Sequence, residues 1–349
     1  MSEPPTSPAP AAARVSAVRR AVSIAPEQLV RFSALDAQYS LPTVAMPQVA
    51  ALSLPQWLAA HREQCAAQLR VSGALLLRGF QAPSVEEFET LLREFAGELL
   101  HYTYGSTPRA LVSGKVYTST EYPPELRIPL HNEMCYARQW PMKLALMCVT
   151  PSPVGGETPI ADSRRIYARM PAEVRARFAE HGVMYVRNYG AGLDVSWQDT
   201  FRTTERDEVE NFCRAAGIEW QWLGEDGLRT RQVCQGVARH PETSEMVWFN
   251  QAHLFHVSNL DGETRTLLSD NVGVDHLPRN ALYGDGTPID DDDLAAVRGV
   301  LDEEAVRFPW QRGDVLLLDN MLTAHGREAF SGARRVVVGM NQSFALDAG

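Results

Sequence analysis

The sequence predicts an α+β fold with a mainly β core, arranged as a β-sandwich or jelly roll decorated with helices. After residue 110 the chain repeats short runs of β-branched and apolar residues between turn signals, which is typical of closely spaced strands. Before that point lies one cluster of helical patterns. The motifs G-x-G-x-x-G and G-x-x-x-x-G-K-[ST] are absent, so the sequence lacks the phosphate signature of the doubly wound nucleotide-binding folds.

Helical spacing first appears in residues 54–70, where apolar side chains recur every three or four positions. The run 73–79, Gly-Ala-Leu-Leu-Leu-Arg-Gly, predicts a short buried strand that ends at a glycine. A second helix is expected after Ser84, because Ser84 and Glu87 have the spacing of a capping box. Its apolar face would consist of Phe88, Leu91, Leu92 and Phe95.

Strands and helices are expected to alternate in the rest of the chain. The expected strands are 112–118, 143–149, 182–186, 246–249, 314–319 and 335–340. The expected helical insertions are 163–180, 204–216 and 289–303, the last with an acidic first turn that suits the helix dipole. We therefore expect one domain over residues 21–349, with an insertion around 163–300, after a disordered Pro/Ala-rich tail at 1–20.

The composition argues against several classes of function. Lys and Arg number 33 against 43 Asp and Glu, a formal net charge of −10, so no basic face for nucleic acid is expected. No apolar run approaches the roughly 20 residues that span a bilayer, and the N-terminus has no apolar signal region. Five cysteines without a C-x-x-C pair indicate buried thiols in a reducing compartment. We expect a cytoplasmic protein, and a homo-oligomer stays open.

A candidate metal site begins with His131 and Glu133, which are two residues apart. In an extended strand such side chains point to the same face, about 7 Å apart along the strand. The third ligand would be His325, which follows the apolar run 315–319. Two imidazoles and one carboxylate on one octahedral face leave three positions open, which favours non-haem Fe(II) over the tetrahedral sites of zinc.

A second histidine pair, His253 and His256, has a spacing that could bind a metal on a helix. Packing or substrate contact is the favoured interpretation of that pair.

A binding site for a co-substrate is indicated by Arg335, ten residues after the last candidate ligand, at the start of the apolar run 336–340. A guanidinium buried on a core strand needs a carboxylate partner, because an unpaired buried charge is costly. A dicarboxylate co-substrate would supply it through a bidentate pair. Thr158 is the candidate hydroxyl donor beside it, whereas Arg334 is expected to be a surface charge on an edge strand.

In these residues the sequence resembles the TauD/TfdA (taurine dioxygenase-like) family of Fe(II)/2-oxoglutarate oxygenases, over about residues 70–344. The resemblance is carried by His131-Asn-Glu133, Pro153-Val-Gly-Gly-Glu-Thr158, His325-Gly-Arg327 and the pair Arg334-Arg335. It implies a double-stranded β-helix, which is a jelly roll, with helical insertions. It also implies Fe(II), 2-oxoglutarate and O₂ as cofactor and co-substrates, with iron bound by His131, Glu133 and His325. Thr158 and Arg335 would bind the distal carboxylate of 2-oxoglutarate.

Within that family the sequence is similar to the syringomycin-type aspartyl hydroxylases of nonribosomal peptide pathways. The similar phrases lie at 117–124, 156–164, 183–190, 247–251 and 308–311. The similarity implies hydroxylation of an unactivated C–H bond of an amino acid or amino-acid derivative in antibiotic biosynthesis. Whether a peptidyl carrier protein presents the substrate stays open. Gly339 stands where the taurine enzyme has its sulfonate-binding arginine, which argues against an alkylsulfonate substrate.

Glu133 also bears on the outcome of the reaction, because related halogenases lack this carboxylate. Halogenation is therefore disfavoured, while desaturation and epoxidation stay open. The side chains expected to bind an amino-acid substrate are Arg187, Arg239, Asn250, Gln251 and Arg327. Each has an alternative interpretation as a structural residue that satisfies a loop backbone.

Two other classes of protein stay open. One is a non-catalytic jelly-roll binding protein, and the other is a zinc hydrolase that uses the same three candidate ligands. A hydrolase would lack the helical H-E-x-x-H motif and would leave Arg335 without a role.

Overall fold

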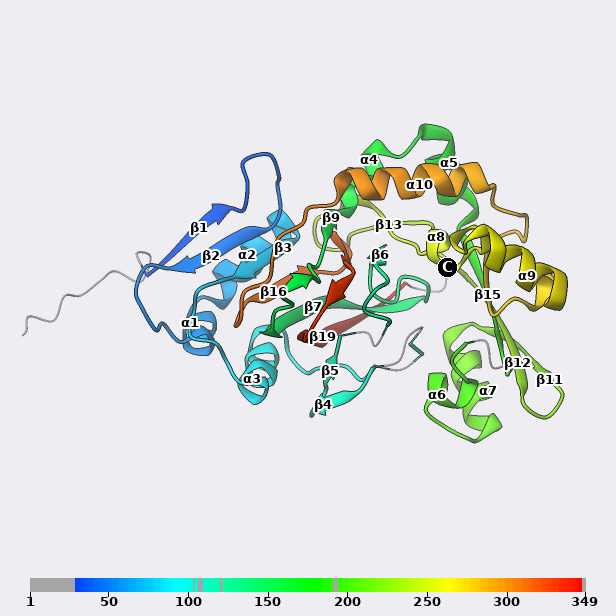
Figure 1. Cartoon of the computed structure of the whole chain (residues 1–349), viewed down its shortest axis with the longest axis horizontal. Coiled ribbons are helices and arrows are strands. Elements are labelled where there is room, and N and C mark those ends of the chain that lie inside the picture. Colours follow the sequence, from blue (N-terminus) through cyan, green and yellow to red (C-terminus); the bar gives the residue numbers. More distant parts are fainter. Residues whose placement is uncertain (1–28, 103, 106–108, 120–121, 191–193, 347–349) are drawn as a thin grey trace, which may run out of the picture.

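The computed structural model describes residues 29–102, 104–105, 109–119, 122–190 and 194–346 (Figure 1). The expected tail at 1–20 lies outside this range. Along the part of the chain that is described, no helix is both long and apolar enough to cross a membrane.

The largest layer is an eight-stranded sheet whose strands come from both ends of the chain. Its order is β1 (Val30–Ala34), β2 (Thr43–Pro47), β3 (Ala74–Leu77), β16 (Val315–Asp319), β7 (Gln139–Thr150), β19 (Arg335–Ala345), β5 (Val116–Thr118) and β4 (Leu111–Ser113). Neighbouring strands are antiparallel except β2 and β3, which are parallel.

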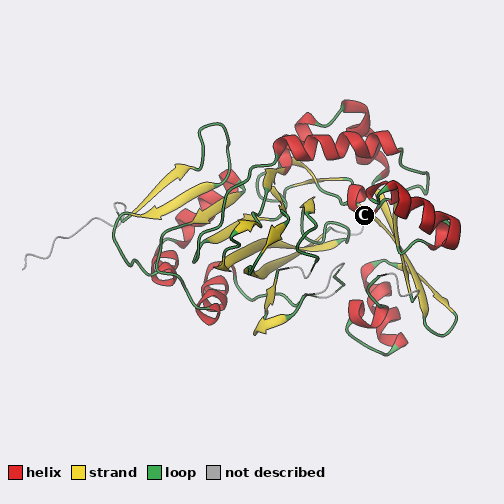
Figure 2. Ribbon diagram, viewed as in Figure 1, coloured by secondary structure: helices red, strands yellow, loops and turns green. Residues whose placement is uncertain are grey.

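Helices cover one face of this sheet (Figures 1 and 2). They are α1 (Leu54–Ala60), α2 (Arg62–Ser72) and α3 (Val85–Ala96). The capping box expected at Ser84 and Glu87 is present and begins α3. Apolar side chains of α3, such as Phe88 and Leu92, pack against Val315 and Leu317 of β16 in one core.

The opposite face of the large sheet meets a smaller sheet of order β6 (Ile128–His131), β17 (Thr323–Arg327) and β9 (Ile160–Asp162). Leu316 and Leu318 of β16 point into this second core. Because successive side chains of a strand alternate between faces, a strand covered on both faces reads as one continuous apolar run. Two facing sheets with added helices confirm the predicted mainly-β jelly roll.

The additions lie between residues 163 and 304. A four-stranded sheet has the order β11 (Glu219–Leu223), β12 (Gly227–Cys234), β10 (Val183–Tyr189) and β15 (Arg279–Tyr283). The helices are α4 (Ser163–Arg169), α5 (Ala172–His181), α6 (Trp197–Phe201), α7 (Arg206–Ala216), α8 (Ala252–Phe255), α9 (Gly262–Val272) and α10 (Asp291–Glu304). The remaining elements of the fold are short. Two strand pairs are β8 (Val154–Gly155) with β18 (Phe330–Ser331) and β13 (Val237–Arg239) with β14 (Met246–Trp248), and two 3-10 helices are η2 (Val257–Asn259) and η3 (Val274–His276).

Several expected elements differ from those observed. The helix expected at 163–180 is two helices, because Pro171 precedes α5 and its ring does not fit inside a continuous helix. The strand expected at 112–118 is a hairpin that turns at Gly114, where φ is +48°. The helix expected at 54–70 is interrupted at His61.

Candidate metal centre

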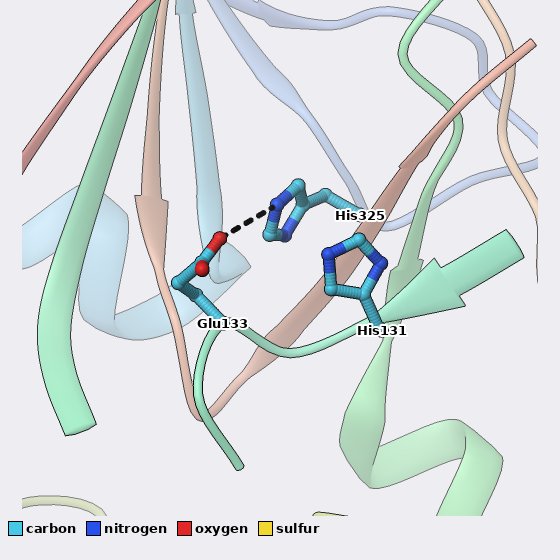
Figure 3. A group of neighbouring side chains, drawn as sticks. All are labelled: His131, Glu133 and His325. Atoms are coloured by element: carbon cyan, nitrogen blue, oxygen red, sulfur yellow. Dashed lines mark ion pairs between the residues drawn. The ribbon is translucent and has the colours of Figure 1, made fainter. Parts of the chain in front are cut away.

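The three predicted metal ligands lie together beside the paired strands β6 and β17 (Figure 3). One ligand atom from each of His131, Glu133 and His325 lies within 4.8 Å of the others. His131 and His325 are direct partners on the neighbouring strands β6 and β17, with ring centroids 4.6 Å apart. Antiparallel pairing thus brings together residues that are far apart in sequence.

Glu133 does not continue the strand of His131, as the spacing predicts, but lies in the turn that follows β6. Asn320 holds this turn. Its Oδ1 accepts the Glu133 N–H at 2.7 Å, and its Nδ2 donates to the carbonyl oxygens of Glu133 at 2.9 Å and Pro141 at 2.8 Å. Asn132 Nδ2 donates back to the Asn320 carbonyl at 2.6 Å. These contacts fix the carboxylate relative to the segment that leads to His325.

Asp319, at the end of β16, fixes the next turn of the chain. Its Oδ1 accepts the N–H groups of Met321 and Leu322 at 3.1 and 3.2 Å. Its Oδ2 contacts Lys143 Nζ at 2.7 Å and His240 Nε2 at 3.2 Å. Sequence reasoning missed Asp319 and Asn320, although two polar residues directly after a fully apolar strand are a usable signal.

The protonation of the two imidazoles suits metal binding. His131 Nδ1 lies 2.9 Å from the carbonyl oxygen of Pro129, so the proton belongs on Nδ1 and the lone pair on Nε2. Burial lowers the pKa of His131, although Glu133 partly offsets this, and it lowers the pKa of His325 well below its usual value. Two neutral imidazoles and one carboxylate could hold a divalent transition metal.

A cation that sequence reasoning did not find lies against this cluster. Arg109 Nη2 donates to Glu133 Oε2 at 2.7 Å, and the guanidinium lies 4.5 Å from the centre of the Tyr102 ring. The Arg109 residue is only 8% exposed. It belongs to no helix or strand and to no motif, so its sequence context carried no signal.

A small cavity of about 30 Å³ adjoins the candidate ligands. Its walls include His131, His325, Thr158, Arg109, Arg327 and Arg334. Thr158 is 2% exposed, and its Oγ1 accepts a hydrogen bond from Trp310 Nε1 at 3.0 Å. The cavity therefore combines cations and a hydroxyl beside the candidate metal ligands, as a carboxylate co-substrate requires.

Of the two neighbouring arginines, Arg334 and not Arg335 lines this cavity, which corrects the prediction of Arg335. Arg334 is half-buried, with Nε donating to the Gly156 carbonyl at 2.9 Å and Nη1 to Ser119 Oγ at 3.3 Å. Burial lowers the pKa of Arg334 to about 10. Arg335 is exposed. The pKa of Glu86 in α3 is lowered by hydrogen bonds from its own N–H and from Ser84, and to a smaller extent by the charge of Arg335.

The predicted substrate-binding arginines fall into different environments. Arg327 donates to the carbonyl oxygens of Tyr122, Pro123 and Leu126 at 2.9, 2.6 and 2.7 Å, so it orders the loop beside the cavity. Arg187 is 1% exposed and lies between the rings of Tyr104 and Tyr189.

Arg239 does not reach the site, which corrects that prediction. It is exposed on β13 and donates to the Ser244 carbonyl at 2.7 Å. A short strand that pairs only with β14 leaves this side chain at the surface.

The predicted amides are buried and bonded to backbone. Asn250 Nδ2 donates to the Gly236 carbonyl at 2.7 Å, and Gln251 Nε2 donates to the Asn132 carbonyl at 2.8 Å. His253 Nε2 lies 2.9 Å from the Leu130 carbonyl, so this histidine braces β6. Gln251 also borders a second cavity.

This second cavity has a volume of about 130 Å³ and includes Glu133 in its wall. It is lined by Arg109, Tyr122, Arg127, Ile128, Pro129, His131, Glu133, Tyr136, Gln251, Leu254, Phe255, Asn259 and Arg279. Aromatic walls with a few cations and amides are typical of a pocket for a small polar molecule.

Comparison with known proteins assigns the chain to a family. Residues 39–341 match the family model described as taurine catabolism dioxygenase TauD, TfdA family. The dapdiamide synthesis protein DdaC of Enterobacter agglomerans is 41% identical over 272 residues, which cover 78% of this chain and 83% of that protein. A clavaminate synthase-like protein of Arabidopsis thaliana is 34% identical over 315 residues, covering 86% and 92% respectively.

Solved structures support the fold. PvcB, described as an Fe, alpha-ketoglutarate dependent oxygenase from an isonitrile synthetic pathway, superposes with a TM-score of 0.53 at 17% identity, over 91% of this chain and 93% of PvcB. AAD-2 in complex with Mn(II) and N-oxalylglycine superposes with a TM-score of 0.51 at 12% identity, over 89% and 96%. The chain therefore belongs to the TauD/TfdA family and is an iron(II)- and 2-oxoglutarate-dependent dioxygenase.

Proposed function

We propose that this dioxygenase hydroxylates an unactivated C–H bond of an amino acid or amino-acid derivative in a biosynthetic pathway. The observation that carries the proposal is the carboxylate of Glu133 within the cluster with His131 and His325. Glu133 would occupy the third protein-ligand position on the metal, so that position is not open to a halide. Oxygen transfer is therefore favoured over halogenation.

The second cavity supports an amino-acid-type substrate. Arg109 and Arg127 can meet a carboxylate, and Gln251 and Asn259 offer amide groups for polar substituents. The likeness to the dapdiamide synthesis protein, at 41% identity, agrees with a biosynthetic role. Presentation of the substrate on a carrier protein is part of this proposal, since the same pocket could receive a tethered aminoacyl group.

The residues of the chain have distinct tasks in this proposal. His131, Glu133 and His325 hold the iron, which supplies the oxidising chemistry when it is bound. Arg334 and Thr158 hold the distal carboxylate of 2-oxoglutarate in the smaller cavity. Arg327 keeps the loop around residues 122–126 in place.

Aromatic side chains form part of the wall of the second cavity. The rings of Tyr136 and Phe255 pack there in a tilted arrangement, with their centroids 5.3 Å apart. Apolar walls of this kind limit the access of water to a reactive centre and so reduce side reactions with solvent.

Anaerobic reconstitution with Fe(II) and 2-oxoglutarate, followed by exposure to O₂ with free and carrier-loaded amino acids, tests the proposal. Mass spectrometry of each substrate is the readout, and succinate formation is measured in parallel. A product heavier by one oxygen atom, with a new hydroxyl carbon in its NMR spectrum, supports hydroxylation.

Three other outcomes would contradict the proposal of hydroxylation. A product lighter by two hydrogen atoms identifies desaturation, and an oxirane signal identifies epoxidation. A protein that binds iron and 2-oxoglutarate but forms no succinate with any substrate would favour a binding protein instead. The Glu133→Ala variant is the negative control, because it removes one of the three proposed iron ligands.

A further inference from the structure

Arg109 is a buried cation at the candidate metal centre, and the function proposed above defines neither the source of its carboxylate partner nor how that contact depends on the metal. We propose that Arg109 binds a carboxylate beside the metal, from either 2-oxoglutarate or the substrate, once the metal engages Glu133. This inference rests on the proposed function, because it takes His131, Glu133 and His325 as the metal ligands.

Arg109 borders both cavities that include the candidate ligand His131. It lines the smaller cavity with Thr158 and Arg334, and it lines the substrate-side cavity with Gln251. It also borders a third cavity of about 310 Å³, which includes Tyr102 and Thr200. A single side chain therefore forms the common wall of three spaces.

Part of the guanidinium has unused hydrogen-bonding capacity. Nη2 donates to Glu133 Oε2 at 2.7 Å. Nε is buried and lacks a hydrogen-bond partner among the residues that the structure describes. A buried N–H without a partner destabilises the protein, and a ligand that accepts a hydrogen bond from it removes that cost. The planar fork of arginine matches the two oxygens of a carboxylate.

Charge explains why the ligand would be an anion. The side chains of Arg109 and Glu133 are each only 5% exposed, so their charges are poorly screened. A divalent metal on Glu133 draws the negative charge of the carboxylate toward itself, and the same metal repels the guanidinium. Arg109 then needs a second anion, and the cavities that it borders are the routes by which one can enter.

The alternative is that Arg109 only braces Glu133. The two roles predict opposite effects on metal binding. A brace that is removed leaves Glu133 less well placed, so metal affinity falls. A carboxylate-binding cation that is removed relieves repulsion, so metal affinity stays constant or rises while carboxylate affinity falls.

The Arg109→Gln variant separates these roles without any turnover. Zinc(II) affinity is measured first by competition with a chelator. The affinity for 2-oxoglutarate is then measured by calorimetry on the zinc-loaded protein. In a second arm, acetate and its uncharged analogue acetamide are titrated into the zinc-loaded protein saturated with N-oxalylglycine. Thermal unfolding reports whether the variant folds, and Arg239→Gln, which changes an exposed arginine, is the matched control.

We expect Arg109→Gln to bind zinc at least as tightly as the parent and to lose at least about tenfold in carboxylate affinity in one of the two arms. A loss for 2-oxoglutarate names the co-substrate as the source, and a loss for acetate alone names the substrate. Arg109→Lys, which keeps the charge but not the fork, should recover part of the loss.

Unchanged affinity in both arms overturns the proposal, as does a loss of carboxylate affinity accompanied by a tenfold or larger loss of zinc affinity. If Arg109→Gln does not fold, Arg109→Lys provides the same comparison. Failure of the proposed function is distinguishable, since it would show as a parent protein that binds zinc and 2-oxoglutarate in these assays but oxidises no substrate after reconstitution with Fe(II) and exposure to O₂.

Discussion

Asn320 connects the two halves of the metal centre through one side-chain amide. It bonds both the N–H and the carbonyl of Glu133, and it lies five residues before His325. Hydrogen bonds that orient metal ligands commonly contribute 10- to 100-fold to metal affinity. Asn320 is thus a positioning residue rather than a ligand.

Replacing Asn320 with Ala should lower zinc affinity by about 10- to 100-fold, because the turn that carries Glu133 loses its clamp. Chelator competition measures this, and thermal unfolding separates it from general destabilisation. Asn341→Ala is the control, since Asn341 is equally buried but its Nδ2 donates to the Gly97 carbonyl, away from the centre. Equal zinc affinity in the parent and Asn320→Ala would show that Glu133 is held by other contacts.

Separate substitutions of the adjacent residues Arg334 and Arg335 test which of them binds the distal carboxylate of 2-oxoglutarate. Arg334→Gln should raise the KM for 2-oxoglutarate at least about tenfold, because a charged hydrogen bond to the distal carboxylate is lost. Arg335→Gln should change it by less than about twofold, since that side chain lies at the surface. Succinate formation at varied 2-oxoglutarate measures both. The reverse order of effects would restore the sequence-based choice of Arg335.

At the scale of residues, the sequence predicts which residue types form the site better than it predicts which way each side chain points. The ligand triad could be found because its residue types and order are specific. Arg334 could have been chosen by strand alternation, since it shares parity with Val336 and Val338, which face the interior between the sheets. Arg109 could not have been found, because only the fold brings this loop residue to Glu133.

At the scale of elements, the short connection from β16 to β17 is held by several hydrogen bonds and ion pairs of one residue, Asp319. Asp319 is fully buried and closes this connection with two backbone N–H groups and two basic side chains. Removing one partner from a buried charge cluster typically destabilises a protein by about 3–5 kcal/mol, because the remaining charge is left unpaired.

Asp319→Asn should therefore lower the free energy of unfolding by about 3 kcal/mol or more. Chemical denaturation of the metal-free protein measures the change. Asp302→Asn is the comparison, since Asp302 pairs with Arg127 at a half-exposed site, where such a pair contributes less than about 1 kcal/mol. A similar small change in both variants would contradict the importance given to the buried cluster.

The elements also show which local patterns suffice for prediction. The capping box and amphipathic face of α3, and the apolar run of β16, were predicted because the signals are contained in the elements themselves. Strands β11 and β12 were missed. The side chains of β11 are only half-buried or exposed, so the strand lacks a clear apolar face, and β12 joins the sheet through β10, which is distant in sequence.

At the scale of the whole molecule, buried histidines link acidity to stability. His253 joins the added α8 to the jelly-roll strand β6, and burial lowers its pKa from 6.5 to about 3. The unfolded chain therefore takes up a proton below pH 6.5 that the folded chain excludes. The stability that neutral His253 contributes is complete above pH 6.5 and is lost as the pH falls toward 3.

The free energy of unfolding should fall by about 1.4 kcal/mol per pH unit for this one proton between roughly pH 6 and 4. Urea denaturation at several pH values measures the slope. His253→Gln keeps an N–H donor but does not titrate, so its slope should be smaller by that amount. An equal slope in His253→Gln and the parent would contradict this assignment.

The contact between Glu133 and Asn320 joins parts of the chain that are 187 residues apart. In terms of polymer topology, a metal held by His131, Glu133 and His325 closes a ring that contains the entire added region. Closing so long a loop removes much of the conformational freedom of the unfolded chain, so the metal acts as a reversible cross-link. Metal at 100 times its dissociation constant would stabilise the fold by about 2.7 kcal/mol, so the metal-free enzyme should be cleaved more readily by proteases within residues 163–304.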